Sequence, residues 1–163
     1  MTHTATLTPA AKSNHRSDAA PASTHEPKDA IAMLKADHEE VDQLFAEYTK
    51  ARSVPAKKAL IAEICAALTV HVQIEEELFY PAIKSALKDK LLVPEATVEH
   101  DGVKALIAQL EDAEPGGEMV DAQVKVLSEY VKHHVKEEHT EMFPKAKASS
   151  LDMVALGALM AAR

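Results

Sequence analysis

The sequence predicts an all-α fold, an antiparallel up-down-up-down four-helix bundle. After residue 27, apolar residues recur at the three-to-four spacing of a helix, and no segment alternates with the two-residue period of a strand. Pro55, Pro94 and Pro115 fall between the periodic segments, as expected for connections between helices. Short connections favour antiparallel neighbours. At 163 residues the chain has the length of one domain.

The elements follow in order along the chain. Residues 1–27 are rich in Thr, Ser, Ala and Pro and have few large apolar side chains, so we expect a disordered tail. Three solvated histidines in the tail need no further role: His3, His15 and His25. The bundle domain then covers residues 28–163. We expect its long helices over about 28–51, 56–89, 94–113 and 118–147, and a short fifth helix over about 150–161.

One histidine interrupts the apolar stripe of each long helix. These residues are His38, His71, His100 and His134. Two of them are followed one turn later by a glutamate, Glu75 or Glu138, in the similar segments HVQIEEELFYP and HVKEEHTEMFP. The first pair of histidines is 33 residues apart and the second pair 34. The chain therefore predicts two helical hairpins of one plan, packed with approximate two-fold symmetry.

Helical rise places the four histidines within about two turns of one level of the bundle, at roughly 1.5 Å per residue. One core layer would then hold four imidazoles and two carboxylates, each costly to bury without a partner. A pair of divalent cations satisfies all six groups. Residues four apart share a helix face, so His and Glu in His-x-x-x-Glu reach one cation, and a Glu from each half can bridge two.

The type of ligand narrows the choice of metal. Imidazole and carboxylate with open positions favour iron, with manganese second, over calcium or a closed zinc site. Cys65 is the only cysteine, which excludes thiolate-rich centres and an internal disulfide; we expect it to be a small buried residue. No histidine has Glu three residues before it, so the Glu-x-x-His motif of ferritin-like sites is absent, as is the zincin motif HExxH.

The segments DHEEVDQLF, HVQIEEELFYP, VEHDGVKAL and HHVKEEHTEMFP resemble the hemerythrin-like, or HHE cation-binding, family over about residues 29–160. The resemblance implies four helices around a non-haem di-iron centre. It implies ligand roles for His38, His71, Glu75, His100, His134 and Glu138. Oxygen-carrying hemerythrins have a further His one turn after the position of His100, where this chain has Lys104, and Asp rather than Glu138. These departures argue against stable oxygen carriage, because one iron loses an imidazole.

We therefore expect a centre of two iron ions that reacts with a small oxidant, dioxygen or hydrogen peroxide. Peroxide decomposition by an enzyme is one form of this function. The alternative is a protein that binds or senses oxygen, nitric oxide or iron without turnover. A net charge of −8 without a basic stripe argues against nucleic acid as a partner. The lack of a signal-peptide run or of 18 consecutive apolar residues argues for a cytoplasmic chain without a membrane span. The sequence leaves the oligomeric state open.

Several neighbours of the motifs have other expected roles. His133 with Glu137 repeats the His-x-x-x-Glu spacing, but the apolar stripe and the proline ten residues on both select His134 with Glu138. The remaining glutamates of the motifs are expected on a solvated acidic face that could attract cations: Glu76, Glu77 and Glu141. The three tyrosines could donate hydrogen bonds near the centre, but core packing is their chief expected role: Tyr48, Tyr80 and Tyr130.

Overall fold

The computed structural model describes Met1 and residues 29–163. Residues 2–28, which hold nearly all of the expected tail and its three histidines, lie outside the described residues. Every regular element in the described part is helical, which confirms the all-α class. In order these elements are α1 (Ala30–Lys50), α2 (Val54–Ile74), the π-helical turn η1 (Glu75–Phe79), α3 (Tyr80–Ala86), α4 (Leu92–Glu111), α5 (Glu118–Glu137), the π-helical turn η2 (Glu138–Met142), α6 (Phe143–Lys147) and α7 (Met153–Ala161).

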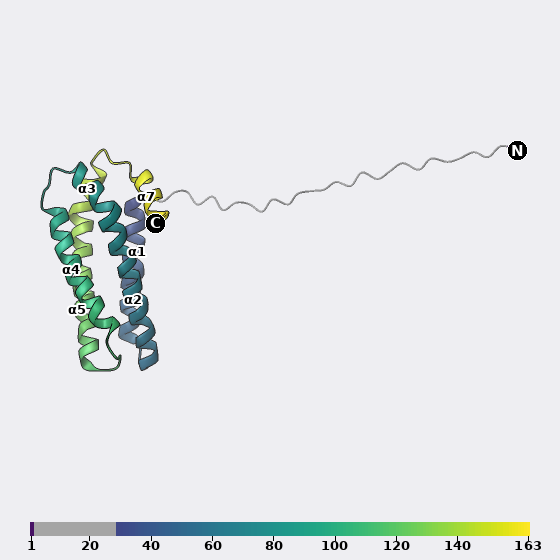
Figure 1. Cartoon of the computed structure of the whole chain (residues 1–163), viewed down its shortest axis with the longest axis vertical. Helices are drawn as coiled ribbons and strands as arrows, with labels where there is room; N and C mark the ends of the chain where they lie inside the picture. Colours follow the sequence, from purple (N-terminus) through teal and green to yellow (C-terminus); the bar gives the residue numbers. More distant parts are fainter. Residues whose placement is uncertain (2–28) are drawn as a thin grey trace.

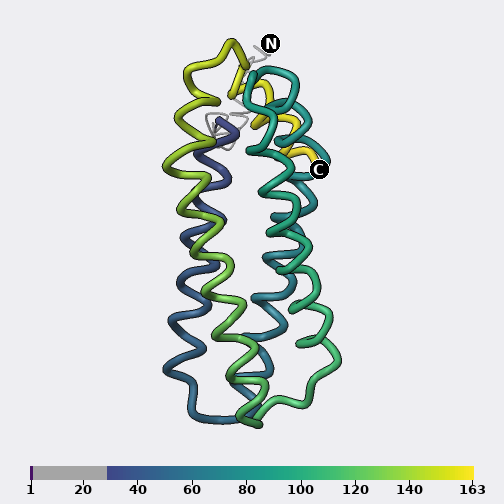
Figure 2. The backbone as a smooth tube through the Cα atoms, turned by 90° about the vertical axis from the view of Figure 1, so that its left-hand side faces the viewer, coloured from purple at the N-terminus to yellow at the C-terminus, as the bar shows by residue number. Residues whose placement is uncertain are grey.

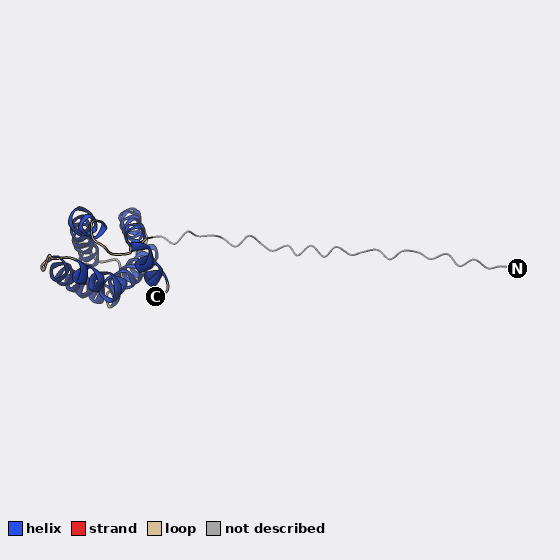
Figure 3. Cartoon of the chain, turned by 90° about the horizontal axis from the view of Figure 1, so that it is seen from above, coloured by secondary structure: helices blue, strands red, loops and turns tan. Residues whose placement is uncertain are grey.

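The long helices form the predicted antiparallel bundle. α1 and α2 make one hairpin and α4 and α5 make the other (Figure 1). α2 also packs against α4, and α1 against α5, so the four helices surround a shared interior (Figures 2 and 3). α7 packs against α1 and η1, at the end of the bundle where α3 lies. None of the helices in the described residues is both long and apolar enough to cross a membrane.

Polar caps fix several helix ends. Asp29 accepts a hydrogen bond from the backbone N–H of Ala32 at the start of α1, and Ser53 does the same for Ala56 at the start of α2. Asp152 accepts hydrogen bonds from two N–H groups of α7. This cap makes α7 begin at Met153, three residues later than the sequence predicts. The second long helix ends at Ala86, earlier than the expected position near residue 89.

Two apolar clusters fill the bundle, one on each side of a polar layer. The larger cluster lies among α1, α2, α4 and α5 and includes Phe45, Leu68, Ile107 and Leu127. The smaller cluster, toward the end covered by α7, includes Leu34, Phe79, Phe143 and Met160. The polar residues between them on the same helices include the histidines that interrupt the apolar stripes. The layer is therefore enclosed by apolar packing above and below.

The sequence predicts that the second and fourth long helices are continuous α-helices, but in the structure each is interrupted. Each contains a π-helical turn in which an N–H bonds the carbonyl five residues back, Tyr80 to Glu75 and Phe143 to Glu138. Proline is the second residue of the α-helical segment after each turn, at 81 and 144, where its ring would crowd the preceding turn of an α-helix. The wider turn shifts the register of the later helical residues by about one position. Leu78, expected in the apolar stripe, is consequently only half-buried, whereas Phe79 and Tyr80 are buried.

Candidate metal centre

The structure brings the six residues selected from the sequence into one buried layer. α1, α2, α4 and α5 each supply one histidine, and each glutamate is the first residue of a π-helical turn. All six side chains are at most 7% exposed: His38, His71, Glu75, His100, His134 and Glu138. Their burial fits the expectation that the stripe positions face the interior. Metal ligation by these six residues stays a prediction.

The imidazoles form two pairs that face each other. Nε2 of His38 lies 3.1 Å from Nε2 of His71, and Nε2 of His100 lies 3.1 Å from Nε2 of His134. Oε2 of Glu75 lies 3.3 Å from His71 Nε2 and 3.2 Å from His100 Nε2, so this carboxylate contacts both pairs.

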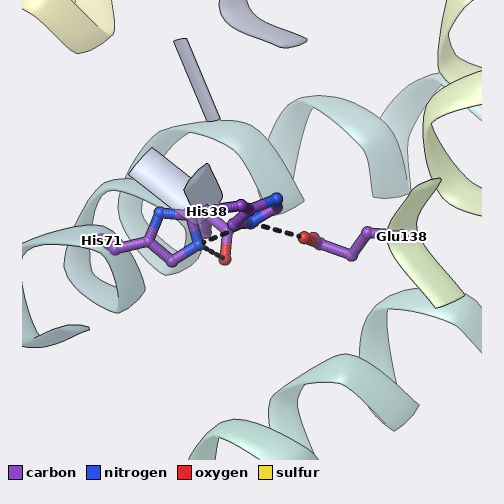
Figure 4. Close-up of side chains that lie close together, drawn as sticks. His38, His71 and Glu138 are labelled. Atoms are coloured by element: carbon purple, nitrogen blue, oxygen red, sulfur yellow. Dashed lines mark hydrogen bonds and ion pairs between the residues drawn. The ribbon is translucent and has the colours of Figure 1, made fainter. Parts of the chain in front are cut away.

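The second carboxylate also lies between the pairs. Oε2 of Glu138 is 3.3 Å from Nε2 of His38, a contact drawn as a dashed line in Figure 4, and 3.6 Å from Nε2 of His134. The arrangement is therefore two histidine pairs connected by two carboxylates. The contacts thus place one glutamate from each half between the two histidine pairs.

The outer nitrogens of two histidines bind acidic residues in a symmetric way. Nδ1 of His71 donates to Asp37 Oδ2 at 3.4 Å, and Nδ1 of His134 donates to Glu99 Oε2 at 2.7 Å. Asp37 and Glu99 each directly precede the histidine of the partner helix in the same hairpin. An acid at Nδ1 fixes the ring and leaves Nε2 directed inward, as in histidines that ligate metals.

The other two histidines are held by the residue that follows each glutamate. Nδ1 of His100 lies 3.2 Å from Glu76 Oε1, and Nδ1 of His38 lies 3.0 Å from His139 Nε2. Glu76 is thus a partner of the site rather than only part of a solvated face. The two halves follow the same plan, but one uses a carboxylate where the other uses an imidazole.

Tyr80 is a site residue that the sequence analysis placed in core packing. Its hydroxyl lies 3.2 Å from Glu75 Oε2, Glu138 Oε1 and His100 Nε2. Phe143 stands at the corresponding position of the other half and has no hydroxyl. The π-helical turn brings Tyr80 to this point, so regular α spacing could not single it out among the three tyrosines that could donate hydrogen bonds near the centre. The sequence feature that could have indicated this role is the difference between the two repeats before their prolines, FYP in the first and MFP in the second.

Burial and mutual contact shift the pKa values of these groups in opposite directions. Burial, followed by the neighbouring His71, lowers the pKa of His38 to about 3. Burial also acts against a charged His134, but hydrogen bonds to Glu75 and Glu99 outweigh it and raise the pKa to about 10. Burial alone would raise the pKa of Glu75, yet the surrounding histidines hold it well below its usual range.

The donor set fits a pair of cations. Oε1 of Glu75 and Oε2 of Glu138 are buried and accept no hydrogen bond from the described residues. Ligand atoms within 4.8 Å of one another form two buried groups, one of His38, His71, Glu75 and Glu138 and one of Glu75, His100 and His134. Glu75 belongs to both groups. Four imidazoles whose Nε2 atoms face inward, together with two carboxylates, are a donor set that suits divalent transition metals.

The remaining residues weighed from the sequence lie outside this layer. His133 is 64% exposed, so the structure supports the register in which His134 points inward. Lys104 does not point to the histidine pair, because its ammonium binds Glu76 and Asp101 on the outer side of His100. Cys65 is buried as expected, but Tyr130 is half-exposed rather than part of the core.

Comparison with known proteins gives matches of three kinds. The family model described as hemerythrin HHE cation binding domain matches residues 29–146. A crystal structure of a hemerythrin HHE cation binding domain-containing protein from Mycobacterium kansasii is similar with a TM-score of 0.71 and 26% identity, covering 83% of this chain and 85% of that one. A curated relative, a DNA nickase of Nostoc sp. (strain PCC 7120 / SAG 25.82 / UTEX 2576), is 26% identical over 111 residues.

The match to the nickase covers 68% of this chain but only 31% of the relative, so the chain spans about a third of that protein's length. The family model covers most of the chain, including all six residues of the buried layer. The chain therefore belongs to the hemerythrin HHE cation-binding domain family.

Proposed function

We propose that the buried layer holds two iron ions and that the centre reacts with a small oxidant, hydrogen peroxide or dioxygen. Bound iron would supply one-electron redox chemistry. The residues supply the rest: four imidazoles and two shared carboxylates hold the ions and balance their charge, and the Tyr80 hydroxyl is a hydrogen-bond donor beside them. Manganese is the second choice of metal for this donor set.

The size of the space beside the histidines is the observation that carries the choice of substrate. A space of about 10 Å³ among the helices is lined by the four histidines and by valine and leucine side chains such as Val41, Leu68 and Val103. That volume holds roughly one water-sized molecule. A diatomic gas or hydrogen peroxide fits the site with small side-chain movements, whereas a larger organic substrate does not.

We do not extend the nucleic-acid activity named for the Nostoc relative to this chain. The match covers 31% of that protein. This chain has 26 acidic and 18 basic side chains, a balance that disfavours contact with phosphates. A small uncharged ligand is the partner that this narrow space of four histidines and apolar side chains supports.

Metal analysis of the protein purified in air tests the proposal, together with optical spectra under oxygen and under peroxide. We expect two iron atoms per chain and consumption of hydrogen peroxide by the oxidised protein. His71→Ala and Glu138→Ala should lower the iron content sharply, and His133→Ala, one residue away from the buried position, is the control that should not.

Two results would contradict the proposal in different ways. Iron-free protein, or equal iron in all three variants, would show that this layer does not hold a di-iron centre. Stable, reversible oxygen binding without peroxide turnover would leave the alternative function, a protein that binds or senses a gas.

A further inference from the structure

A pocket lined by glutamates leads from the surface to the buried layer. It lies among α4, α5 and η2, and Glu95, Glu99, Glu137 and Glu141 line it. Its inner wall includes His134 and Glu138, two of the residues proposed to hold iron. The pocket therefore connects acidic surface residues with the candidate metal centre.

An exposed histidine outside the lining of this pocket contacts two of the glutamates that line it. Nε2 of His133 lies 3.3 Å from Oε1 of Glu99 and 3.3 Å from Oε1 of Glu137. The three residues offer ligand atoms within 4.8 Å of one another, and His133 is 64% exposed while Glu99 is 21% exposed. One imidazole and two carboxylates, with water in the remaining positions, are suitable ligands for a divalent transition metal.

Glu99 joins this outer cluster directly to the buried layer. One of its oxygens, Oε1, faces His133, and the other, Oε2, accepts a hydrogen bond of 2.7 Å from Nδ1 of His134. At the inner end of the pocket, Glu138 is 1% exposed and its Oε2 accepts no hydrogen bond from the described residues. Glu138 thus lines the inner end of the pocket, and its Oε2 faces the imidazoles of His38 and His134 in the buried layer.

The charge along the pocket favours entry of cations. Among the described residues, no lysine or arginine forms an ion pair with Glu95, Glu99 or Glu137, and only Glu141 has one, with Lys145 at 3.8 Å. Carboxylates in a recess that are not neutralised by a lysine or arginine raise the local concentration of cations and their rate of association.

We propose that Glu99, His133 and Glu137 form an outer site for a divalent cation, and that iron passes from it through the acidic pocket to the buried layer. The loading step rests on the proposed function, because it needs an inner site that takes iron. The existence of the outer site does not, since its three ligands lie on the surface. The competing interpretation is a solvated ion pair in which a protonated His133 binds two carboxylates and no metal.

Binding of Mn²⁺ tests the outer site. The purified full-length protein, with whatever metal its inner site retains, is titrated with Mn²⁺, and free Mn²⁺ is measured by electron paramagnetic resonance. We expect one Mn²⁺ per chain to bind without displacing the retained metal. His133→Ala and Glu137→Gln should abolish this binding. Glu129→Gln is the matched control, because it removes one exposed carboxylate from the same helix, away from the pocket.

The rate of iron loading tests the path. Metal-free protein is mixed with Fe²⁺ without oxygen, and unbound Fe²⁺ is captured at intervals by a coloured chelator. We expect His133→Ala and Glu137→Gln to reach the same final iron content as the unmodified chain but roughly tenfold more slowly, with a weaker dependence on salt. Glu129→Gln should load at the unmodified rate.

Each outcome decides part of the proposal. Mn²⁺ binding that persists in both variants, or no Mn²⁺ bound to the unmodified chain, overturns the outer site. Loading at an unchanged rate overturns the path. A chain that takes up no iron contradicts the proposed function and with it the loading step, while the Mn²⁺ titration still decides the outer site.

Discussion

Nε2 of His139 lies 3.0 Å from Nδ1 of His38, where the other half of the bundle places a carboxylate, Glu76, on His100. Burial, followed by the charge of Lys35, lowers the pKa of His139, and the pKa of His38 is also lowered. Both rings are therefore neutral near pH 7, and one donates a hydrogen bond to the other. This contact orients His38 but adds no negative charge, so the two halves of the layer are not electrostatically equal.

We expect His139→Ala to weaken retention of metal in the half that contains His38. Loss of a partner that orients a ligating histidine costs roughly ten- to a hundredfold in metal affinity. Release of iron to a competing chelator measures the effect. His139→Glu gives His38 a carboxylate partner of the kind that Glu76 gives His100, and this variant should retain metal at least as well as the unmodified chain. Equal release from His139→Ala and the unmodified chain would show that the contact has no such role.

Tyr80→Phe should leave the bundle folded but change the site. The ring remains, while the hydroxyl that contacts Glu75 and Glu138 is lost, so two buried carboxylates lose a donor. We expect the metal-free variant to be less stable by about 1–3 kcal/mol, measured by urea unfolding. Iron content should stay at two per chain, and the optical spectrum should shift. An unchanged spectrum and unchanged stability would show that Tyr80 has only a packing role.

The sequence predicted the bundle and the six-residue layer because both depend on helical periodicity. An apolar stripe determines which side of each helix faces the interior, and His38 or His100 replaces one apolar residue of that stripe without moving it. The height of each histidine along the bundle, calculated from a rise of about 1.5 Å per residue, then predicts that the four histidines lie close to one level. The prediction needed no knowledge of side-chain conformation.

The features that the sequence did not predict depend on local departures from that periodicity. The π-helical turns at Glu75 and Glu138 add a residue to one turn, which brings Tyr80 into the layer and moves Leu78 out of the core stripe. The partners Asp37 and Glu76 were missed for another reason. Each contacts a histidine on a different helix, and such contacts depend on how helices pack rather than on spacing within one helix.

Cys65 should be unreactive in the folded protein. Burial, followed by the negative charge of Glu111, raises the pKa of its thiol to about 11, and only the thiolate attacks alkylating reagents. Between pH 7 and 9 we expect very slow modification by iodoacetamide, followed by one fast modification per chain when urea unfolds the protein. Mass spectrometry gives the number of modified thiols. Fast modification of the folded chain at pH 7 would mean that this part of the core opens readily.

Glu138→Gln should have opposite effects on the metal-free and the metal-bound protein. Burial, followed by the charge of Glu75, raises the pKa of Glu138 well above its usual range, so ionising this carboxyl in the folded metal-free chain is unfavourable. Glutamine removes that cost. We therefore expect the metal-free variant to be at least as stable as the metal-free unmodified chain at pH 7.

The sign of the pH dependence is set by the raised pKa of Glu138. The proton on Glu138 stabilises the folded state fully below the usual pKa of glutamate, and this stability is lost as the pH rises through the higher pKa of the folded chain. The advantage of Glu138→Gln in the metal-free protein should therefore shrink as the pH is lowered toward 4.5. With iron present the order reverses, because glutamine cannot supply the negative charge between the two histidine pairs. Urea unfolding of both proteins, with and without iron, measures the two effects. A metal-free Glu138→Gln protein much less stable than the unmodified chain would show that the ionised carboxylate stabilises the fold through His38 and His134 even without a cation.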